Sequence, residues 1–476
     1  MAANVKQGRK RNLALRVAFY TGVAIFGSIV LVVLINLYEP DLDPGAAVAM
    51  RAMPSQVPDA ENSFFTHYGM GVAAGQDPHA YGIRYVTAIN SWAQTQDTGQ
   101  PEDKSDVEAM RTKAETLLWR DDKKQDLCGE PRVDCLLAYA RHRPQIEKLT
   151  RDNPLLLERY RSLYHYKSFR DATLSRYYPR LPDYAGAEQL TVLAQIALKT
   201  VSGNVDEALR DLATDTAYWR RVLSGASTVV SKMVAVNLLS RNYALASEIA
   251  AQYRDRPAVA VYLTEMMKPL SAEERSMRGA FISEYQLAAF LYSSLRNPEN
   301  VYWGTLVIVG QDKYSWLRTF AALFYKPNAT INLHYKYIEK YLVLDDAPAH
   351  MLMDAARRVD NDFGDITNMV RLDMAYNPIG KIIFAEEAVT PVKYIARIHN
   401  LDGSMRLLRL QLAIYSKNVA VKDVGSFLEN SQADLFDSYR NQPFRWEPTT
   451  RELWFEGINP QSNDALATNL RIGVRI

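Results

Sequence analysis

Two cysteines are the first residues in this sequence whose type and spacing could do chemistry. Cys128 and Cys135 are seven positions apart, around Gly129 and Pro131. In an oxidising compartment such a close pair predicts a disulfide across a helix-to-helix turn. A zinc site that adds His142 is the alternative, but three widely spaced ligands without a fourth nearby match a tetrahedral site poorly. We therefore expect a disulfide and no metal.

Glu284 is the candidate for acid–base catalysis. It falls on the apolar face of an expected helix, between Phe281 and Ala288, where burial would disfavour its charged form, as a general acid requires. A structural ion pair with an arginine is the alternative and is favoured, because such pairs also perturb carboxylates. Asn237, one turn from Met233, is expected to be a buried polar clamp. The sequence has no His-Glu-x-x-His, Gly-x-Ser-x-Gly or Ser-x-x-Lys motif.

Basic and aromatic residues alternate between positions 155 and 184. Arg159, Tyr166, Arg170 and Tyr177 are the candidates there for binding a sugar or an acidic partner. Half of the aromatic residues in this stretch also follow helical spacing, which predicts that they are buried in the core and that the arginines form a solvated face. The core interpretation is favoured over the binding patch.

A glycine-rich stretch, Gly69 to Gly75, resembles a phosphate-binding loop. It lacks the G-x-G-x-x-G spacing, no β-branched strand precedes it and no lysine follows it. Its glycines are instead expected to allow close helix packing or a turn, and His67 beside it is expected to be a structural histidine. We predict no nucleotide and no cofactor.

The organisation of the whole chain depends on an uncharged apolar run, Val17–Tyr38, of 22 residues. As a helix it would be about 33 Å long and would cross a bilayer. Five basic and no acidic residues precede it, which predicts a cytoplasmic N-terminus and a body on the far side of the membrane. A cleaved signal peptide is the alternative, but its apolar part is usually only 7–15 residues long.

The expected domain organisation follows from this anchor. It comprises a basic cytoplasmic tail (1–16), a transmembrane helix (17–38), a proline-containing tether (39–60), an α-helical periplasmic body (61–400) and a C-terminal helix plus β-hairpin (401–476). Hydrophobic residues make up 48% of the chain and charged residues 23%, as in folded proteins. The net charge is +2 and the tail supplies more than that, so no nucleic-acid partner is expected.

Helical periodicity dominates the body, and the predicted fold class is mainly α, an irregular helical array with a small α+β end. An Asn204–Glu207 cap predicts a helix that ends near Gly225, and the Ser271–Glu274 capping box predicts a long helix that ends before Asn297. Short aromatic segments at 443–447 and 452–456 predict a β-hairpin, with a possible third strand at 470–476. Helices are further expected at 229–239, Asp77–Gln94, Asp106–Arg120, Asn153–Ser168, Tyr314–Tyr325, Ile331–Leu344, Ala347–Val359, Ile379–His399, 405–415 and 424–429.

Two resemblances rest on particular residues. The helix Met405–Tyr415, followed by Asp434-Leu-Phe-Asp437 and Gln442-Pro-Phe-Arg-Trp446, resembles the C-terminal part of type II secretion pseudopilins. Leu435 stands where that pattern has proline, and no prepilin cleavage site precedes the apolar run, so the resemblance implies a shared way of ending a helix with a hairpin. With Trp219-Arg-Arg and Ser231-Lys-Met-Val-Ala235, the chain also resembles a group of bacterial membrane-anchored helical proteins that carries no assigned activity. This second resemblance implies a Gram-negative periplasm.

These observations favour a single-pass bacterial inner-membrane protein with a structural or interaction role, anchored in the lipid bilayer through Val17–Tyr38 and presenting helical surfaces to an envelope or secretion-related protein. A cell-wall-directed hydrolase that uses Glu284, or a glycan- or peptide-binding protein, is the alternative function.

Overall fold

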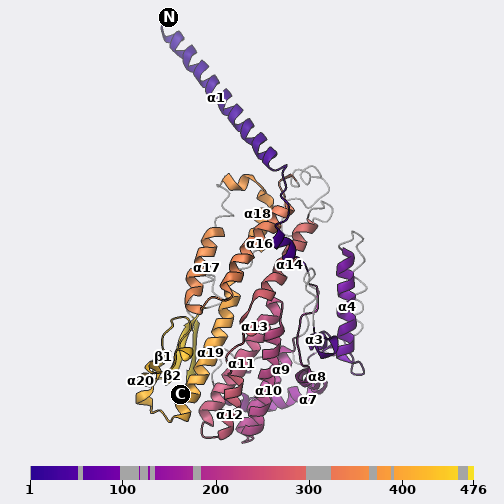
Figure 1. Cartoon of the computed structure of the whole chain (residues 1–476), viewed down its shortest axis with the longest axis vertical. Coiled ribbons are helices and arrows are strands. Elements are labelled where there is room, and N and C mark those ends of the chain that lie inside the picture. The colour runs from indigo at the N-terminus through magenta and orange to yellow at the C-terminus, as the bar shows by residue number, and fades with distance from the viewer. Residues whose placement is uncertain are drawn as a thin grey trace. The chain divides into compact units, whose positions relative to one another are not determined.

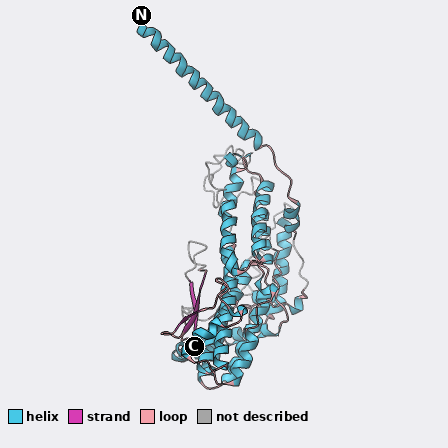
Figure 2. Cartoon of the chain, turned by 60° about the vertical axis from the view of Figure 1, so that its left-hand side comes forward, coloured by secondary structure: helices cyan, strands magenta, loops and turns pink. Residues whose placement is uncertain are grey.

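The chain divides into two units in a computed structural model. The structure describes residues 2–51, 57–96, 117, 119, 127–128, 134–174, 184–295, 323–363, 372–387, 391–458 and 470–476. Unit 1 comprises Met1–Arg51, Tyr285–Glu339 and Val359–Val389, and unit 2 comprises Ala52–Glu284, Lys340–Arg358 and Thr390–Ile476. Figure 1 traces the elements in chain order, and Figure 2 shows that helices dominate them. The mainly α fold class is confirmed.

Unit 1 contains the N-terminal helix and helices from two later parts of the chain. Its elements are α1 (Ala2–Ile35), α2 (Pro44–Ala49), a 3₁₀ turn (Leu372–Ala375), α18 (Pro378–Glu387) and parts of α14 (Arg278–Ser294), α16 (Pro327–Leu344) and α17 (Ala349–Phe363).

Unit 2 holds most of the body and the sheet. Its α-helices, besides the remaining parts of α14, α16 and α17, are α3 (Phe64–Tyr68), α4 (Pro78–Gln96), α6 (Cys135–Arg141), α7 (Arg143–Asp152), α8 (Pro154–Ser162), α9 (Gly186–Val201), α10 (Val205–Gly225), α11 (Val229–Gln252), α12 (Pro257–Met266), α13 (Ala272–Arg275), α19 (Val392–Ser416) and α20 (Val424–Glu429). Its strands are β1 (Arg445–Glu447), β2 (Glu452–Gly457) and β3 (Leu470–Arg475), and 3₁₀ turns lie at Asp59–Glu61, Leu163–His165, Val421–Asp423 and Ala433–Leu435.

Helix α10 forms the centre of unit 2 and confirms the periodicity argument. It packs against α9, α11 and α12. Its apolar face, from Val205 through Leu212 to Trp219 and Leu223, is buried as expected, because residues three and four positions apart share one side of a helix. The Asn204 side chain accepts no hydrogen bond from the backbone N–H groups of the first turn, so packing rather than this cap defines the helix start.

The capping box at Ser271 and Glu274 is confirmed. The long helix expected to end before Asn297 is present as α14 (Arg278–Ser294), but the capping box does not start it. Ser271 Oγ accepts a hydrogen bond from the backbone N–H of Glu274, and the Glu274 carboxylate accepts one from Ser271. Helix α13 then ends at Arg275. The Asp345 carboxylate accepts hydrogen bonds from the backbone N–H groups of Met277 (2.7 Å) and Arg278 (3.1 Å) and starts α14. A tertiary contact therefore divides what the sequence presents as one helix.

The expected helix Ile379–His399 is also wrong. Helix α18 ends at Glu387, and α19 begins at Val392 after Pro391. Proline lacks a backbone N–H and disfavours helical geometry in the residue before it. The expected helix Asn153–Ser168 ends earlier, at Ser162, and continues as a 3₁₀ turn. Asp106–Arg120 and most of Tyr314–Tyr325 lie outside the described residues.

The sheet has the order β1-β2-β3 and is antiparallel throughout, which confirms the hairpin and the third strand. Arg445 pairs with Trp454, and Leu453 pairs with Val474. Inward side chains of β2, Leu453 and Phe455, are fully buried in a cluster with residues of α19 and α20. The alternation of apolar and polar residues in β3 therefore places its apolar side chains on this core.

The N-terminal helix and the segment after it differ in one respect from the expectation. No residue of Leu15–Ile35 is buried, and the stretch has a mean hydropathy of 2.4, so this helix is long and apolar enough to cross a membrane. Residues 39–60 were expected to be a tether. Instead, Asn328 donates a hydrogen bond to Pro40 O (3.0 Å), Asn332 donates one to Asp41 O (2.9 Å), and α2 is held by Gln286, which donates to Ala49 O. Residues 39–51 are thus packed within unit 1.

Candidate functional site

Arg159, a predicted binding residue, has a structural position. Its side chain is buried, with 5% of the residue exposed. Its guanidinium donates hydrogen bonds to the backbone oxygens of Met70 (2.7 Å), Val72 (2.7 Å), Ala73 (3.0 Å) and Gln76 (3.3 Å). The arginine thereby fixes the turns that follow α3 and satisfies carbonyls that would otherwise be buried without partners.

The other candidates from the basic and aromatic stretch do not gather around an open site. Tyr166 is half-buried, stacks on His79 with 4.8 Å between ring centroids, and accepts a hydrogen bond from Thr66 Oγ1 (2.8 Å). The backbone of Arg170 exchanges hydrogen bonds with the Asn62 side chain. Tyr177 lies outside the described residues. These contacts support the core interpretation for Tyr166, whereas the expectation that the arginines form a solvated face is wrong for Arg159, because its guanidinium is buried against four backbone oxygens.

A buried polar network explains several of the tyrosines and was missed by sequence reasoning. The Asp215 carboxylate is fully buried and accepts hydrogen bonds from Tyr160, Tyr164 (2.9 Å), Asn242 (2.8 Å) and Gln189 (3.5 Å). Burial raises the pKa of Asp215, and these donors oppose that rise. Because the carboxylate is sealed from solvent and fully hydrogen-bonded, the network stabilises the helical core.

His67, Gly69 of the glycine-rich stretch and Gly82 of α4 are also structural. The His67 ring is fully buried and shares a 2.7 Å hydrogen bond with Tyr218. A Cβ at Gly69 would lie 2.0 Å from Pro78 O, and one at Gly82 would lie 1.8 Å from Phe65 O. The chain therefore needs glycine there for close backbone packing.

The disulfide between Cys128 and Cys135 is present, with the two Cα atoms 4.8 Å apart. It lies at the start of α6, where the Glu248 carboxylate accepts hydrogen bonds from the backbone N–H groups of Cys135 (2.7 Å) and Leu136 (2.8 Å). Burial raises the pKa of Glu248 and these two hydrogen bonds oppose the rise. A carboxylate at the first turn of a helix satisfies N–H groups that lack partners within the helix.

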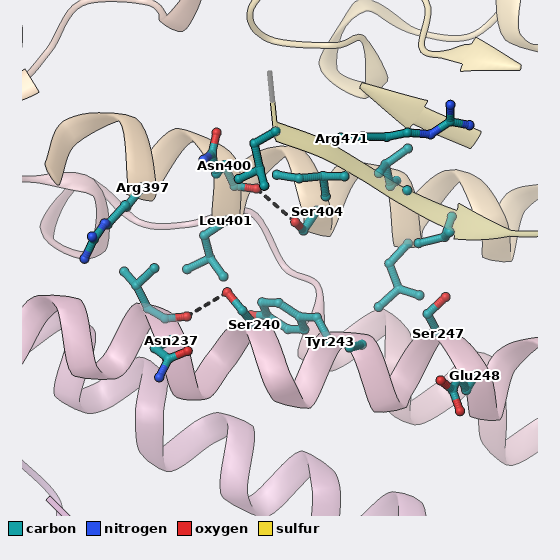
Figure 3. A pocket seen from close by; sticks show the side chains of 18 of the residues that line it. Asn237, Ser240, Tyr243, Ser247, Glu248, Arg397, Asn400, Leu401, Ser404 and Arg471 are labelled. Carbon is teal, nitrogen blue, oxygen red and sulfur yellow. Dashed lines mark hydrogen bonds between the residues drawn. The ribbon is translucent and has the colours of Figure 1, made fainter. Parts of the chain in front are cut away.

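A groove in unit 2 is the candidate functional site. It lies between α11 and α19 and is bordered by β3, with a volume of about 1240 Å³. Figure 3 shows Ser240 of α11 facing Leu401 and Ser404 of α19. Much of its wall is apolar, and includes Leu136, Val234, Val236, Leu401, Leu408 and Ile472. This volume exceeds the 300–1,000 Å³ that is usual for small-molecule sites.

Many hydrogen-bonding groups of the groove are already used by the fold. Ser240 Oγ donates to Val236 O and Ser404 Oγ donates to Asn400 O, both within their own helices. Ser247 Oγ donates to Gln411, which joins α11 to α19. Such contacts position the walls of the groove and leave these hydroxyls without an activating base.

Two groove residues differ from this pattern. The guanidinium of Arg397 makes no hydrogen bond or ion pair with any residue that the structure describes; it lies over the Tyr394 ring, 5.8 Å from the centroid. Asn237 was expected to be a buried clamp, but it is exposed and lines the groove. That part of the expectation is wrong, because α11 buries its neighbours Val236 and Leu238 instead.

Glu284, the predicted acid, is half-buried on α14 and is not among the residues that line this groove. Among the described residues, no group of three or more His, Cys, Asp and Glu side chains could hold a metal ion. Helix α11 and strand β3, which both line the groove, are more than 200 positions apart in the chain. Two features of the sequence could have indicated the groove. They are the alternation of apolar and polar residues in Leu470–Ile476, which predicts a strand, and the polar Asn237 on a predicted helix.

Comparison with known proteins finds no family model, no curated protein and no solved structure that matches this chain. The pseudopilin resemblance and the resemblance to membrane-anchored helical proteins therefore stay predictions.

Proposed function

We propose that this chain is a single-pass bacterial inner-membrane protein that binds an envelope protein in the periplasm, with a structural or interaction role. The observation that carries the proposal is the groove between α11 and α19. It is open, largely apolar and larger than a usual small-molecule site, and several of its polar groups hold the fold together. A surface of this kind suits another polypeptide better than a reacting small molecule.

The anchor supports the membrane part of the proposal. Helix α1 has a 21-residue apolar stretch that the described residues leave uncovered, and lipid is the solvent that favours such a surface. The basic residues before it favour a cytoplasmic N-terminus. The disulfide supports an oxidising compartment for the body. The hydrolase alternative gains no support from the groove, because Glu284 does not line it.

Orientation is tested with C-terminal fusions in Gram-negative cells. A periplasmic body predicts that a C-terminal alkaline phosphatase is active and a C-terminal green fluorescent protein is dark. The reverse pattern would place the body in the cytoplasm and reject the proposal.

Partner binding is tested by photocross-linking in intact cells with the full-length chain. A benzoylphenylalanine replaces the exposed groove residue Asn237 in one variant and Lys422, which is exposed and not a groove residue, in a matched control. We expect a discrete cross-linked protein at position 237, none at position 422, and a weaker product when the anchor is replaced by a cleavable signal sequence. Equal labelling at both positions, or no labelling, would count against the proposal.

A further inference from the structure

The border of the groove is the edge strand of the sheet. All six residues of β3 line the groove, whereas Glu452 is the one residue of β2 that does so. Strand β3 pairs with β2 on one side. Its other edge therefore faces the groove, opposite α11.

The register identifies which backbone groups point into the groove. Ile476 donates its N–H to Arg451 O, so hydrogen bonds to β2 fall on Ile476, Val474 and Ile472, because bonded pairs alternate in an antiparallel ladder. The N–H and C=O groups of Arg471, Gly473 and Arg475 point the other way. Consistent with this, Gln411 donates to Arg475 O (2.7 Å) from α19.

Arg471 and Gly473 leave this edge open. Their outward backbone groups have no hydrogen-bond partner among the residues that the structure describes. Gly473 has no side chain to shield them, and the Arg471 guanidinium lies away from them, over the Trp454 ring at 4.2 Å from its centroid. An unprotected edge is a template for another strand.

The charge of the groove differs between its two ends. At the Arg475 end, Arg475 pairs with Asp134 (3.0 Å) and Glu248 is held by α6. At the Leu470 end, Asn400 donates to Ile458 O, next to the residue that pairs with Leu470. Arg397 lies one helical turn before Asn400 and has no carboxylate partner among the described residues. This end therefore suits a carboxylate.

We propose that the groove binds a partner polypeptide as an extended strand, which pairs antiparallel with β3 at Arg471 and Gly473 and directs a carboxylate to Arg397. This inference rests on the proposed function and adds the mode of binding. Main-chain hydrogen bonds to the strand edge supply affinity, and alternate side chains enter the apolar groove and supply specificity. The carboxylate is either a peptide C-terminus or an acidic side chain.

The test uses the full-length protein in lipid nanodiscs and a random heptapeptide library displayed with a free C-terminus. The peptide selected most strongly is then synthesised with a free carboxylate, with a C-terminal amide, and with an added aspartate before the amide. We expect tight binding of the free acid. If the amide with the added aspartate also binds, the carboxylate is a side chain. If neither amide peptide binds, the carboxylate is the peptide C-terminus.

Two measurements check the pairing itself. N-methylation of the peptide, one residue at a time, is expected to weaken binding at least tenfold at alternate positions only, because every second N–H faces β3. Arg397→Gln is expected to weaken carboxylate-bearing peptides about tenfold and to leave the amide unchanged. Arg409→Gln is the matched control on α19, because Arg409 pairs with Asp434 outside the groove.

Three results would overturn the inference: no peptide selected, no alternation in the N-methyl series, or equal effects of Arg397→Gln and Arg409→Gln. These failures are separable from failure of the proposed function. Cross-linking at position 237 without N-methyl alternation rejects strand pairing alone, whereas alternation without a cross-linked protein in cells rejects the envelope-partner role alone.

Discussion

The backbone N–H of Asn377 donates a 2.8 Å hydrogen bond to Oδ1 of Asn36, a residue inside the apolar run at the N-terminus. The Asn36 amide in turn donates to Ala375 O (2.6 Å) and Val32 O (2.8 Å), and its side chain is fully buried. Asn377 adopts a positive φ of 51° and donates to Thr330 Oγ1 (3.0 Å). The C-terminal end of α1 is thus fixed to the rest of unit 1 by buried polar groups.

Replacing Asn36 by leucine should loosen this junction. The substitution keeps the side-chain volume but leaves the N–H of Asn377 and the carbonyl of Ala375 without partners, each at a cost of about 1–3 kcal/mol. We expect faster hydrogen exchange around residues 372–378 in the protein in nanodiscs. Ser28→Ala is the control, since Ser28 Oγ bonds within its own helix, to Ala24 O. Equal exchange in both variants would contradict the role given to Asn36.

Arg159→Met should destabilise unit 2. Methionine fills similar space, but four backbone oxygens lose their donor, and we expect a loss of about 3 kcal/mol or more in urea unfolding followed by tryptophan fluorescence. Arg161→Met is the matched control, because Arg161 is exposed and bonds to Gln195, and it should change stability by less than about 1 kcal/mol. If Arg159 were a ligand-binding residue instead, its replacement would leave the unfolding midpoint unchanged.

Local patterns in the sequence predicted much of the helical fold, because helices such as α10 are specified by the spacing of their apolar residues. The failures have tertiary causes. Asp345 lies far along the chain from α14, whose first turn it caps, and the packing of residues 39–51 depends on Asn328 and Asn332. No local pattern reports such partners.

The candidate site was less predictable than the fold for the same reason. Glu284 was the candidate for a buried carboxylate, with an ion pair to an arginine favoured, yet the structure buries Asp215, whose partners Tyr160, Gln189 and Asn242 come from three other helices. The groove depends on β3 lying beside α11, and the two are more than 200 residues apart. What the sequence did contain was the alternation in residues 470–476, which predicted a strand but not its open edge.

His334 should make unit 1 sensitive to acid. Its ring is buried on α16 and shares a 3.0 Å hydrogen bond with Tyr292, and burial lowers the pKa of His334 to about 4. A histidine of the unfolded chain takes up a proton near pH 6.5, whereas the buried ring of His334 does so only near pH 4. The free energy of unfolding is therefore highest above pH 6.5, and the contribution of His334 is lost as the pH falls towards 4. The loss should approach about 3 kcal/mol.

The measurement is urea unfolding followed by circular dichroism at pH 7.5 and pH 4.5. His334→Phe should remove this part of the difference between the two pH values, because phenylalanine takes up no proton. His350→Phe carries the same substitution at an exposed position of α17 and should keep the wild-type difference. An unchanged pH dependence in His334→Phe would show that the buried ring is not responsible.

The disulfide and Glu248 should act together on the start of α6. Replacing both Cys128 and Cys135 by serine opens a short covalent loop, which should cost about 2.5 kcal/mol by the chain-entropy estimate. Glu248→Ala leaves the N–H groups of Cys135 and Leu136 without their acceptor, at about 1–3 kcal/mol.

Because both changes release the same turn, their effects should not add. Once the cysteines are gone, the first turn of α6 can fray, and removing Glu248 then exposes N–H groups that already reach water. A double-mutant cycle by urea unfolding should therefore show a coupling of at least about 0.5 kcal/mol. Arg475→Ala is the comparison, since its ion pair with Asp134 is exposed and should contribute less than about 1 kcal/mol. Strictly additive effects would mean that Glu248 and the disulfide act independently. The start of α6 would then not be one cooperative element.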